Sequence, residues 1–350
     1  MKVSCRLYVE ITEPEDLLTL DFDSLPQPLF VMGGGSNLLF TGDFPGTVLH
    51  LCNKGISVLP GEMEDGRSGS AMTEAVIPGL TGNLLVRVGA GVVFDDFCAW
   101  AARERLWGPE NLSLIPGEVG ASAVQNIGAY GVEAKDMIDT VHAFDRTTRT
   151  FVDIPGLECG YGYRTSFFKT SWKGRYLITS VTFHLSTAPQ PKLDYGGVRK
   201  ALGERKPSPE VIRDTIIGIR REKLPDPEEI GSAGSFFCNP VIERDHFERI
   251  VTLAKEENGP EYEVPHYDVG EKVKVPAAWM IDQCGFKGMR LGGAQVYPKQ
   301  PLVIVNATGS ATPEEIVALE RRVIDTIREK YGVELHPEVE HVGAQSTGTQ

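Results

Sequence analysis

The stretch IPGEVGASAVQNIGAYG, residues 115–131, contains four glycines and many small residues around a segment with the character of a short helix. The start of a helix leaves main-chain N–H groups without partners and carries the positive end of the helix dipole, and both favour a diphosphate. Small side chains also let a bulky planar ligand approach the main chain. A close helix–sheet contact would explain the alanines equally well, so the segment needs support from elsewhere in the chain.

Two further glycine turns, GGGSN at 33–37 and GAG at 89–91, each follow an apolar run. Glycine permits positive φ and close main-chain approach, so consecutive N–H groups can face a phosphate. Neither turn fits G-x-G-x-x-G before a helix, and the chain contains no G-x-x-x-x-G-K-[ST] loop. Each turn alone is more typical of a tight connection between strands. Three such segments in one half of the chain favour a bound dinucleotide in a non-Rossmann architecture.

The composition limits the classes of protein that fit. With 350 residues, 41% hydrophobic and 24% charged, the chain is long enough for two or three globular domains. A net charge of −13 argues against a broad nucleic-acid surface, which needs an excess of Lys and Arg. No apolar run approaches the ~20 residues of a membrane helix, and the N-terminus shows no secretory signal. We therefore expect a cytoplasmic protein that binds neither nucleic acid nor membranes.

The cysteines are far apart and form no C-x-x-C pair. This spacing argues against a zinc or iron–sulfur site and against a secreted disulfide framework, so no metal is expected. The six residues are Cys5, Cys52, Cys98, Cys159, Cys238 and Cys284.

Local patterns in the first half indicate strands joined by glycine turns, with one helix. Residues 94–105 have helical spacing, with Phe94 and Arg105 on the apolar stripe and Gly108 as the stop. Residues 175–185 alternate as a strand with one buried face. The polar, glycine-rich segment 60–83 is predicted to be a surface excursion.

The second half has clearer helices, and together the two halves predict an α+β fold. One helix begins with Ser208 as N-cap and Pro209 at the first helical position. In another, Thr312 and Glu315 form a capping box, and the apolar stripe that follows ends before Gly332. The segment KLPDPEEIGSAG is predicted to be a domain junction.

Eight motifs occur in a characteristic order along the chain: GGGSNLL, VGAGV, IPGEVGASAVQNIGAYG, GYGYRTSFFK, KLPDP, AGSFFCNP, IDQCGFKGMRLGGAQV and LHPEV. This ordered set resembles the UDP-N-acetylenolpyruvoylglucosamine reductases, flavoenzymes that make the muramic-acid precursor of bacterial peptidoglycan. The resemblance runs from about residue 30 to about residue 340, nearly the whole chain.

The resemblance implies non-covalent FAD, reduced by NADPH, which leaves before the enolpyruvyl sugar nucleotide enters the same cleft. It implies a two-subdomain FAD-binding fold of the vanillyl-alcohol-oxidase (PCMH) type plus a C-terminal α+β substrate-binding domain, in a monomer. PKLDYGGVRKAL resembles the tyrosine-bearing substrate loop of one subtype. The expected divisions are FAD-binding subdomain 1 at 1–72 with 333–350 returning to it, FAD-binding subdomain 2 at 73–222, and the substrate-binding domain at 223–332.

The implied reaction adds hydride from the flavin to the terminal carbon of an enol ether, so that negative charge builds up as an enolate. By resemblance, Arg164 in GYGYRTSFFK takes the substrate carboxylate with its planar fork, and Glu338 in LHPEV, in its protonated form, stabilises the enolate. Ser235 in AGSFFCNP donates the proton, since an enolate is basic enough to take one from a weak acid. Without the resemblance, Arg164 would be expected to form a surface ion pair, Glu338 to be a solvated strand residue, and Ser235 to lie in a turn or cap a helix.

The resemblance also implies binding residues. For the substrate, Lys223 meets the diphosphate, Asn239 and Gln283 hold the nucleotide or sugar, and Tyr195 closes over it. Tyr163 is a candidate for the substrate or nicotinamide side, although core or hinge packing explains it nearly as well. The implied FAD-binding residues are Gly33, Gly34, Gly35, Ser36, Asn37, Leu38, Gly91, Pro116, Gly117, Gly120, Ala121, Gln125, Asn126, Gly128, Ala129, Tyr130 and Gly131.

Three departures from the family pattern carry their own expectations. Cys238 stands where the family usually has Lys, and Glu340 stands where Arg often follows P-E-V. Both lower the local positive charge, which predicts weaker nucleotide binding. Cys238 would otherwise be an inert buried thiol. The sequence also begins just beyond the family's N-T-F-G segment, which helps to cradle the flavin. Either the true start lies upstream or this protein does without the segment, and FAD affinity is the property that its loss would affect most.

Two alternatives stay open on the residues alone. One is a flavin oxidase or dehydrogenase of another alcohol, which would not need Lys223, Asn239 and Gln283 to clamp a sugar nucleotide. The other is a catalytically degenerate nucleotide- or flavin-binding protein, which the departures at Cys238 and Glu340 would suit.

Overall fold

The computed structural model of the chain describes residues 2–59 and 82–343, which pack into two units. Unit 1 comprises Met1–Ser4, Asn37–Phe44 and Lys223–Gln350, and unit 2 comprises Cys5–Ser36 and Pro45–Glu222. The expected boundary at 72/73 and most of the predicted excursion at 60–83 lie outside the described residues. The division into three domains therefore stays a prediction. Within the described ranges, no helix is both long and apolar enough to cross a membrane.

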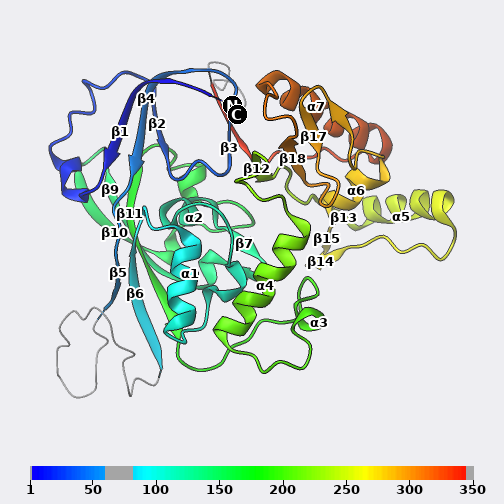
Figure 1. The fold of residues 1–350 in the computed structure, drawn as a ribbon, viewed down its shortest axis with the longest axis horizontal. Coiled ribbons are helices and arrows are strands. Elements are labelled where there is room, and N and C mark those ends of the chain that lie inside the picture. The colour runs from blue at the N-terminus through cyan, green and yellow to red at the C-terminus, as the bar shows by residue number, and fades with distance from the viewer. Residues whose placement is uncertain (1, 60–81, 344–350) are drawn as a thin grey trace. The chain divides into compact units, whose positions relative to one another are not determined.

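Unit 2 is built on an antiparallel sheet of five strands in the order β10-β9-β11-β6-β5 (Figure 1). Helices α1 (Phe94–Arg103) and α2 (Val119–Gln125) share a core with this sheet, in which the rings of Phe97 and Phe183 stack 4.7 Å apart. The strands are β5 (Ile56–Val58), β6 (Asn83–Gly89), β9 (Ile138–Asp145), β10 (Thr150–Pro155) and β11 (Tyr176–Ser186).

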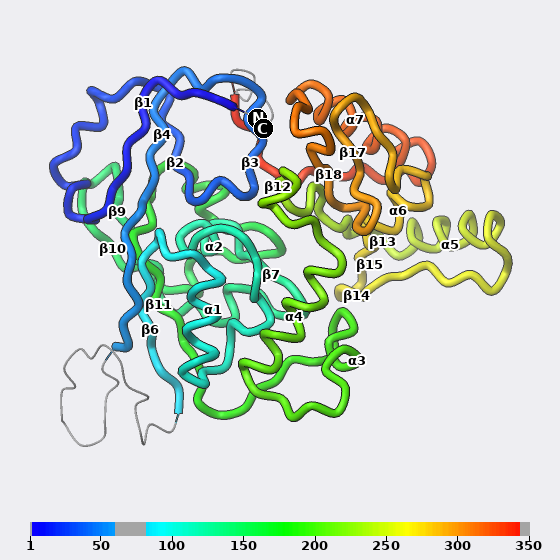
Figure 2. Tube along the Cα trace, viewed as in Figure 1, coloured from blue at the N-terminus to red at the C-terminus, as the bar shows by residue number. Residues whose placement is uncertain are grey.

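A smaller sheet of three strands, in the order β1-β4-β2, completes the first part of unit 2 (Figure 2). Strand β2 (Leu29–Met32) runs parallel to β4 (Phe44–Leu51), and Cys52 donates its N–H to the carbonyl of Ile11 at the end of β1 (Cys5–Ile11). Leu49 and Leu51 point into a core shared with the five-stranded sheet. Because side chains alternate along a strand, His50 and Cys52 are directed to the opposite face.

Strand β11 corrects the expectation of one buried face for residues 175–185. Leu177 packs into the core beneath the smaller sheet, whereas Ile178 and Val181 pack into the core with α1 and α2. Both faces are buried because each is covered by a core layer, and the strand lies in the middle of the sheet, paired with β9 on one edge and β6 on the other. The partial alternation in its sequence does not reveal the second covering layer.

Helix α1 is shorter than its predicted stripe. It ends at Arg103, and Arg105, which was placed on that stripe, instead has a positive φ of 58° outside the helix. The buried face is the expected one, with Phe94, Phe97 and Ala101 fully covered.

The rest of unit 2 consists of short elements and a helical pair. Helix α4 (Pro209–Lys223) begins as predicted: Ser208 accepts a hydrogen bond from the N–H of Val211 at 3.2 Å, and Ile212 and Ile216 are buried. The remaining elements are α3 (Val198–Leu202), strands β7 (Gly128–Ala129) and β8 (Val132–Glu133), and 3-10 helices at Pro14–Leu18, Pro109–Leu112, Ala134–Asp136, Gly156–Glu158 and Phe167–Lys169.

Unit 1 has its own core between helices and a four-stranded sheet in the order β12-β18-β17-β16. A second sheet has the order β13-β15-β14, and β19 pairs in parallel with β3, so that Glu340 lies opposite Leu38. Its strands are β3 (Leu38–Phe40), β12 (Ser232–Ser235), β13 (Val241–Glu243), β14 (Tyr267–Val269), β15 (Lys272–Lys274), β16 (Arg290–Leu291), β17 (Ala294–Val296), β18 (Val303–Asn306) and β19 (Glu340–Val342). Its helices are α5 (Arg244–Asn258), α6 (Ala277–Gln283) and α7 (Pro313–Tyr331).

Helix α7 confirms the predicted capping box. Thr312 accepts a hydrogen bond from the N–H of Glu315 at 3.3 Å, and the Glu315 carboxylate accepts one from the N–H of Thr312 at 3.0 Å. The helix ends at Gly332 in the left-handed conformation, and Leu319 and Val323 on its stripe are fully buried. The mixture of antiparallel sheets and packed helices in both units confirms the α+β class.

Candidate active site

The glycine segments of the predicted FAD site lie side by side in unit 2. A Cβ added to Gly33 would lie 3.2 Å from the Cβ of Ala121, and one added to Gly117 would lie 2.9 Å from the Oγ of Ser36. The N–H of Gly120 donates to the carbonyl of Ala90 at 2.9 Å, which joins 116–121 to the third glycine turn. The structure thus brings all three segments together, although they are far apart in the sequence.

These turns leave main-chain N–H groups available to a ligand. In the described part of the chain, the N–H groups of Gly34, Gly35 and Ser36 donate no hydrogen bond to the protein, and Gly34 is exposed. At Gly120, a Cβ would lie 2.9 Å from the Cβ of Ala90, so a larger residue could not keep this contact. Exposed, adjacent N–H groups between closely packed turns suit an anionic diphosphate, so the residues present fit FAD.

The end of the predicted FAD segment is held by Asn126. This residue is fully buried in the left-handed conformation, and its amide donates to the carbonyl of Gly162 at 2.8 Å and accepts from the N–H of Lys135 at 2.9 Å. Its side chain is therefore used to shape the main chain. Its bond to Gly162 holds the segment that carries Arg164, two residues further along the chain.

Arg164 contacts the predicted FAD segment directly. Its guanidinium donates to the carbonyl of Gly128, and a Cβ at Gly128 would lie 2.8 Å from the arginine Nη1. Arg164 has a φ of 56°, a sparsely populated conformation for a non-glycine residue, and such strain is concentrated at functional sites. The guanidinium carbon lies 5.3 Å from the ring centre of Tyr163.

The tyrosine loop also meets this segment. A Cβ at Gly131 would lie 3.2 Å from the Cβ of Tyr195, and Tyr195 itself is 37% exposed. Asn111, which the sequence did not point to, is fully buried and donates to the carbonyls of Tyr130 at 2.9 Å and Lys192 at 2.8 Å. The amide of Asn111 thus ties the predicted substrate loop to the predicted FAD segment. Burial raises the pKa of Tyr130, which keeps its phenol neutral.

In unit 1, Ser235 and Glu338 lie on neighbouring segments. Ser235 ends strand β12, and the next residue, Phe236, accepts a hydrogen bond from the N–H of Glu338 at 2.8 Å. Phe236 and Phe237 are almost completely buried and anchor the strand end. Gly234 has a φ of 76°, which turns the main chain just before the serine. Ser235 is therefore neither a helix cap nor a plain turn residue.

Two of the predicted FAD-binding residues, Asn37 and Leu38, lie next to the segment that carries Glu338. The amide of Asn37 donates to the carbonyl of Glu338 at 3.1 Å, and Leu38 pairs with Glu340. Cys238, on the other side of Ser235, is half-buried and donates its N–H to the carbonyl of His336 at 3.0 Å, so the expectation of a buried thiol is wrong.

The predicted substrate residues of unit 1 are arranged around helix α6. Asn239 uses its Oδ1 to accept the N–H of Ala277 at 2.9 Å, at the start of the helix, whereas Gln283 is the last helical residue. A helix of this length separates its ends by roughly 10 Å. Lys223 is exposed at the end of α4. Arg164, Tyr163 and Tyr195 belong to unit 2.

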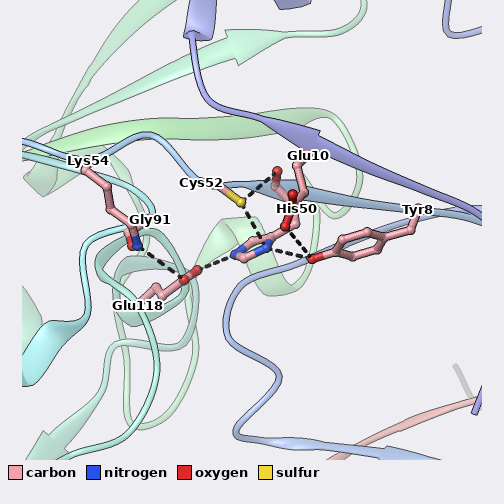
Figure 3. Close-up of polar contacts among 7 residues, drawn as sticks. All are labelled: Tyr8, Glu10, His50, Cys52, Lys54, Gly91 and Glu118. Carbon is pink, nitrogen blue, oxygen red and sulfur yellow. Dashed lines mark hydrogen bonds and ion pairs between the residues drawn. The ribbon is translucent and has the colours of Figure 1, made fainter.

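One buried carboxylate among the glycine turns was not predicted. Glu118 is 8% exposed, and its Oε2 lies 2.8 Å from the Nε2 of His50 (Figure 3). Lys54 lies 4.0 Å from the other carboxylate oxygen and donates to the carbonyl of Gly91. The only hint in the sequence is an acidic residue inside a segment otherwise suited to a phosphate.

Two family descriptions match the chain: the FAD binding domain over residues 21–151, and the C-terminal domain of UDP-N-acetylenolpyruvoylglucosamine reductase over residues 226–342. With the α+β fold and the converging glycine turns, these matches define an FAD-dependent oxidoreductase. A solved structure, UDP-N-acetylenolpyruvylglucosamine reductase from Thermus caldophilus, shares the fold with a TM-score of 0.61 at 23% identity, over 96% of this chain and 92% of that one.

Curated relatives are similar over almost the whole chain. The UDP-N-acetylenolpyruvoylglucosamine reductase of Bacteroides fragilis (strain YCH46) is 43% identical, covering 97% of this chain and 95% of the relative. That of Porphyromonas gingivalis (strain ATCC 33277) is 43% identical, covering 89% and 85%. The chain therefore belongs to the UDP-N-acetylenolpyruvoylglucosamine reductase family, which uses FAD and NADPH in peptidoglycan precursor synthesis. This confirms the predicted family, enzyme class and cofactors, and it sets aside the oxidase and degenerate alternatives.

Proposed function

We propose that this protein reduces the enolpyruvyl group of UDP-N-acetylglucosamine enolpyruvate with Arg164, Ser235 and Glu338 as its catalytic residues. The observation that carries this proposal is the hydrogen bond from the N–H of Glu338 to the carbonyl of Phe236, at 2.8 Å. This bond joins the main chain of Glu338 to the residue that follows Ser235, although nothing in the local sequence relates the two segments, and so supports a common site for them. Bound FAD, reduced by NADPH, supplies the hydride.

Ser235 is the proton donor in this proposal. Its pKa as an ordinary alcohol is far too high for it to protonate a neutral substrate, whereas an enolate carbon is basic enough to take its proton. The buried rings of Phe236 and Phe237 hold the end of β12 rigid, so that the hydroxyl is presented from one side. Delivery from a fixed side would define the stereochemistry of the product.

Glu338 and Arg164 stabilise the negative charge that develops before protonation. Arg164 would pair with the substrate carboxylate through its planar fork, and its strained main chain and contact with Gly128 hold it at the FAD segment. Glu338 must carry a proton when it acts, because an ionised carboxylate would repel the enolate. One preorganised donor of this kind contributes roughly 3–4 kcal/mol to lowering the barrier.

The glycine turns would hold FAD. The available N–H groups of Gly34, Gly35 and Ser36 suit the diphosphate, and the small residues of 116–121 and 128–131 let the flavin approach the main chain. The other predicted FAD residues, including Gln125 and Ala129, belong to the same or adjoining segments.

The sugar nucleotide would be bound mainly by unit 1. Asn239 and Gln283, at the two ends of α6, are separated far enough to contact different parts of an extended ligand. Lys223 is exposed and free of the helix core, as a lysine that meets a diphosphate needs to be. Tyr195 would close from its loop, and Tyr163 would face the substrate or the nicotinamide.

The two half-reactions, followed separately by flavin absorbance, test this assignment. Ser235→Ala should leave flavin reduction by NADPH nearly unchanged and slow reoxidation by the enolpyruvyl substrate by several orders of magnitude. Ser232→Ala, on the same strand, is the matched control and should affect neither. Equal loss of both half-reactions in Ser235→Ala, or normal reoxidation, would refute the proton-donor role.

The protein would act as a cytoplasmic monomer. The wide spacing of its six cysteines argues against a secreted disulfide framework, and NADPH and a nucleotide sugar, the substrates in this proposal, are intracellular metabolites. Light scattering coupled to size-exclusion chromatography should give the mass of one chain; a dimer mass would contradict this.

A further inference from the structure

A cluster of potential metal ligands lies on the smaller sheet of unit 2, outside the predicted catalytic residues (Figure 3). Glu10 comes from β1, His50 from β4, and Cys52 directly follows β4. The carboxylate, imidazole and thiol each offer one ligand atom, and these atoms all lie within 4.8 Å of one another. They share a face because His50 and Cys52 are two residues apart on one strand, with Glu10 on the neighbouring strand.

The histidine is oriented as a metal ligand. Its Nε2 lies 2.8 Å from the Glu118 carboxylate, which can only accept, so Nε2 carries the hydrogen. The lone pair of Nδ1 therefore faces the hydroxyl of Tyr8 at 2.9 Å and the Sγ of Cys52 at 3.1 Å. A carboxylate behind a histidine, fixing its tautomer and raising its basicity, is the usual arrangement around protein-bound metals.

We propose that Glu10, His50 and Cys52 form a binding site for a single Zn²⁺ ion, with solvent or the Tyr8 hydroxyl at the fourth position. Zinc takes this mixture of oxygen, nitrogen and sulfur ligands in tetrahedral sites, with bonds of about 2.0–2.3 Å. Ligand atoms in such a site are roughly 3.3–3.8 Å apart. The Nδ1 of His50 and the Sγ of Cys52, 3.1 Å apart, need to shift by only a few tenths of an ångström, and the Glu10 carboxylate, within 4.8 Å of both, by up to about 1 Å. The absence of C-x-x-C pairs does not bear on a site with one cysteine.

The charges of the ligands and the exposure of Glu10 both suit a divalent cation. A thiolate and the Glu10 carboxylate would balance the two positive charges, while Glu118 stays paired with His50 and near Lys54. Zinc binds the thiolate form of cysteine, so binding must release the proton of Cys52 to solvent. Glu10 is exposed and leaves an entry path for the ion.

The purified full chain, with its flavin and under a reductant that does not bind metal, provides the test. After chelator treatment and desalting, Zn²⁺ titrated in competition with a fluorescent zinc indicator should bind at one ion per chain, more tightly as the pH rises from about 6 to about 8. Cd²⁺ should give an ultraviolet sulfur-to-metal absorption band, a readout independent of activity.

Substitutions of the proposed ligands show whether the bound Zn²⁺ lies at this site. Cys52→Ser should abolish the Cd²⁺ band and weaken Zn²⁺ binding by at least about 10-fold, and Glu10→Gln should weaken it similarly. Cys5→Ser, a free cysteine on the same strand as Glu10, is the matched control and should keep both. Failure to bind one ion per chain, retention of the band in Cys52→Ser, or an equal loss in Cys5→Ser would each overturn the proposal. Circular dichroism of each variant distinguishes lost binding from lost folding.

Discussion

The glycine turns of unit 2 and the strand end of unit 1 prepare a site in opposite ways. In unit 2, contacts at Gly33, Gly117 and Gly120 depend on side chains that are missing, which lets three distant segments meet and exposes their N–H groups. In unit 1, main-chain hydrogen bonds join the segments that carry Ser235 and Glu338. Substitutions in the first region should therefore affect cofactor binding and packing, and those in the second should affect chemistry with little loss of stability.

The largest effect is expected at the second region. Glu338→Ala should slow flavin reoxidation by substrate about 10²–10³-fold, since it removes a donor to the developing enolate. Glu338→Gln should retain more activity, because an amide can still donate a hydrogen bond, and exposed Glu334→Gln serves as the control. Stopped-flow kinetics measures this. If Gln were as damaging as Ala, the protonated form of Glu338 would not be the acting species.

Next in size is a substitution in the glycine region. Gly120→Val should lower the free energy of unfolding by about 2–3 kcal/mol and release FAD, because its side chain would press on Ala90. Gly218→Ala is the control: it lies inside α4 with no neighbour within 4 Å, and should raise stability by up to about 1 kcal/mol. Urea unfolding and flavin retention on a desalting column measure both. A Gly120→Val protein that keeps its flavin and its stability would show that the close contact at Gly120 is not needed for either.

An ion pair in unit 2 gives a smaller, pH-dependent effect. Arg175 donates to both carboxylate oxygens of buried Asp145, which lowers the pKa of that carboxyl below its unfolded value of about 3.9. The folded state thus binds this proton less readily, so the stabilisation is complete above about pH 4 and is lost as the pH falls through the folded pKa. Asp145→Asn should cost about 1–2 kcal/mol at neutral pH, and the difference should shrink in acid.

The exposed pair of Asp194 and Arg199 offers a control for that measurement, since the Asp194 side chain is 88% exposed. Asp194→Asn should change the free energy of unfolding by less than about 0.5 kcal/mol at any pH. Thermal or urea unfolding at several pH values would show whether burial of Asp145 is what makes its pair matter. If the free energy of unfolding changed with pH in the same way in wild type and Asp145→Asn, the lowered pKa of Asp145 would not explain the stabilisation.

The smallest effect concerns the cap of α7. Thr312→Ala should lower the free energy of unfolding by about 1 kcal/mol, because the N–H of Glu315 loses its acceptor. Thr252→Ala, at an exposed position inside α5, controls for loss of a threonine alone. Neither variant should alter flavin binding, in contrast to Gly120→Val. Flavin loss in Thr312→Ala would show that lower stability alone can release the flavin.

Features that depend on residues close together in the sequence were predicted correctly, and features that depend on distant parts of the chain were not. The box of Thr312 and Glu315 is local, so the pattern was sufficient. The burial of β11 on both faces depends on the smaller sheet, which no periodicity within residues 175–185 encodes. Arg105 fits a helical stripe in spacing, yet the chain turns there with a positive φ.

The site shows the same dependence. The motifs pointed to the glycine segments and to Ser235 and Glu338 one by one, but which of them meet is decided by sheet pairing between distant parts of the chain. The contact of His50 with Glu118 and the bridge made by Asn111 left no readable pattern, because each joins single residues of ordinary type.

The pairing of β3 with β19 has a consequence for how the protein is made. Asn37 and Glu338 are 301 residues apart, so a ribosome adding about 5–20 residues per second needs roughly 15–60 s between them. Throughout that time the nascent chain exposes the β3 edge, whose partner strand has not been synthesised, to any other strand nearby. Unit 2 ends at Glu222 and its residues are all synthesised well before that, whereas unit 1 cannot pair β3 until β19 has been synthesised.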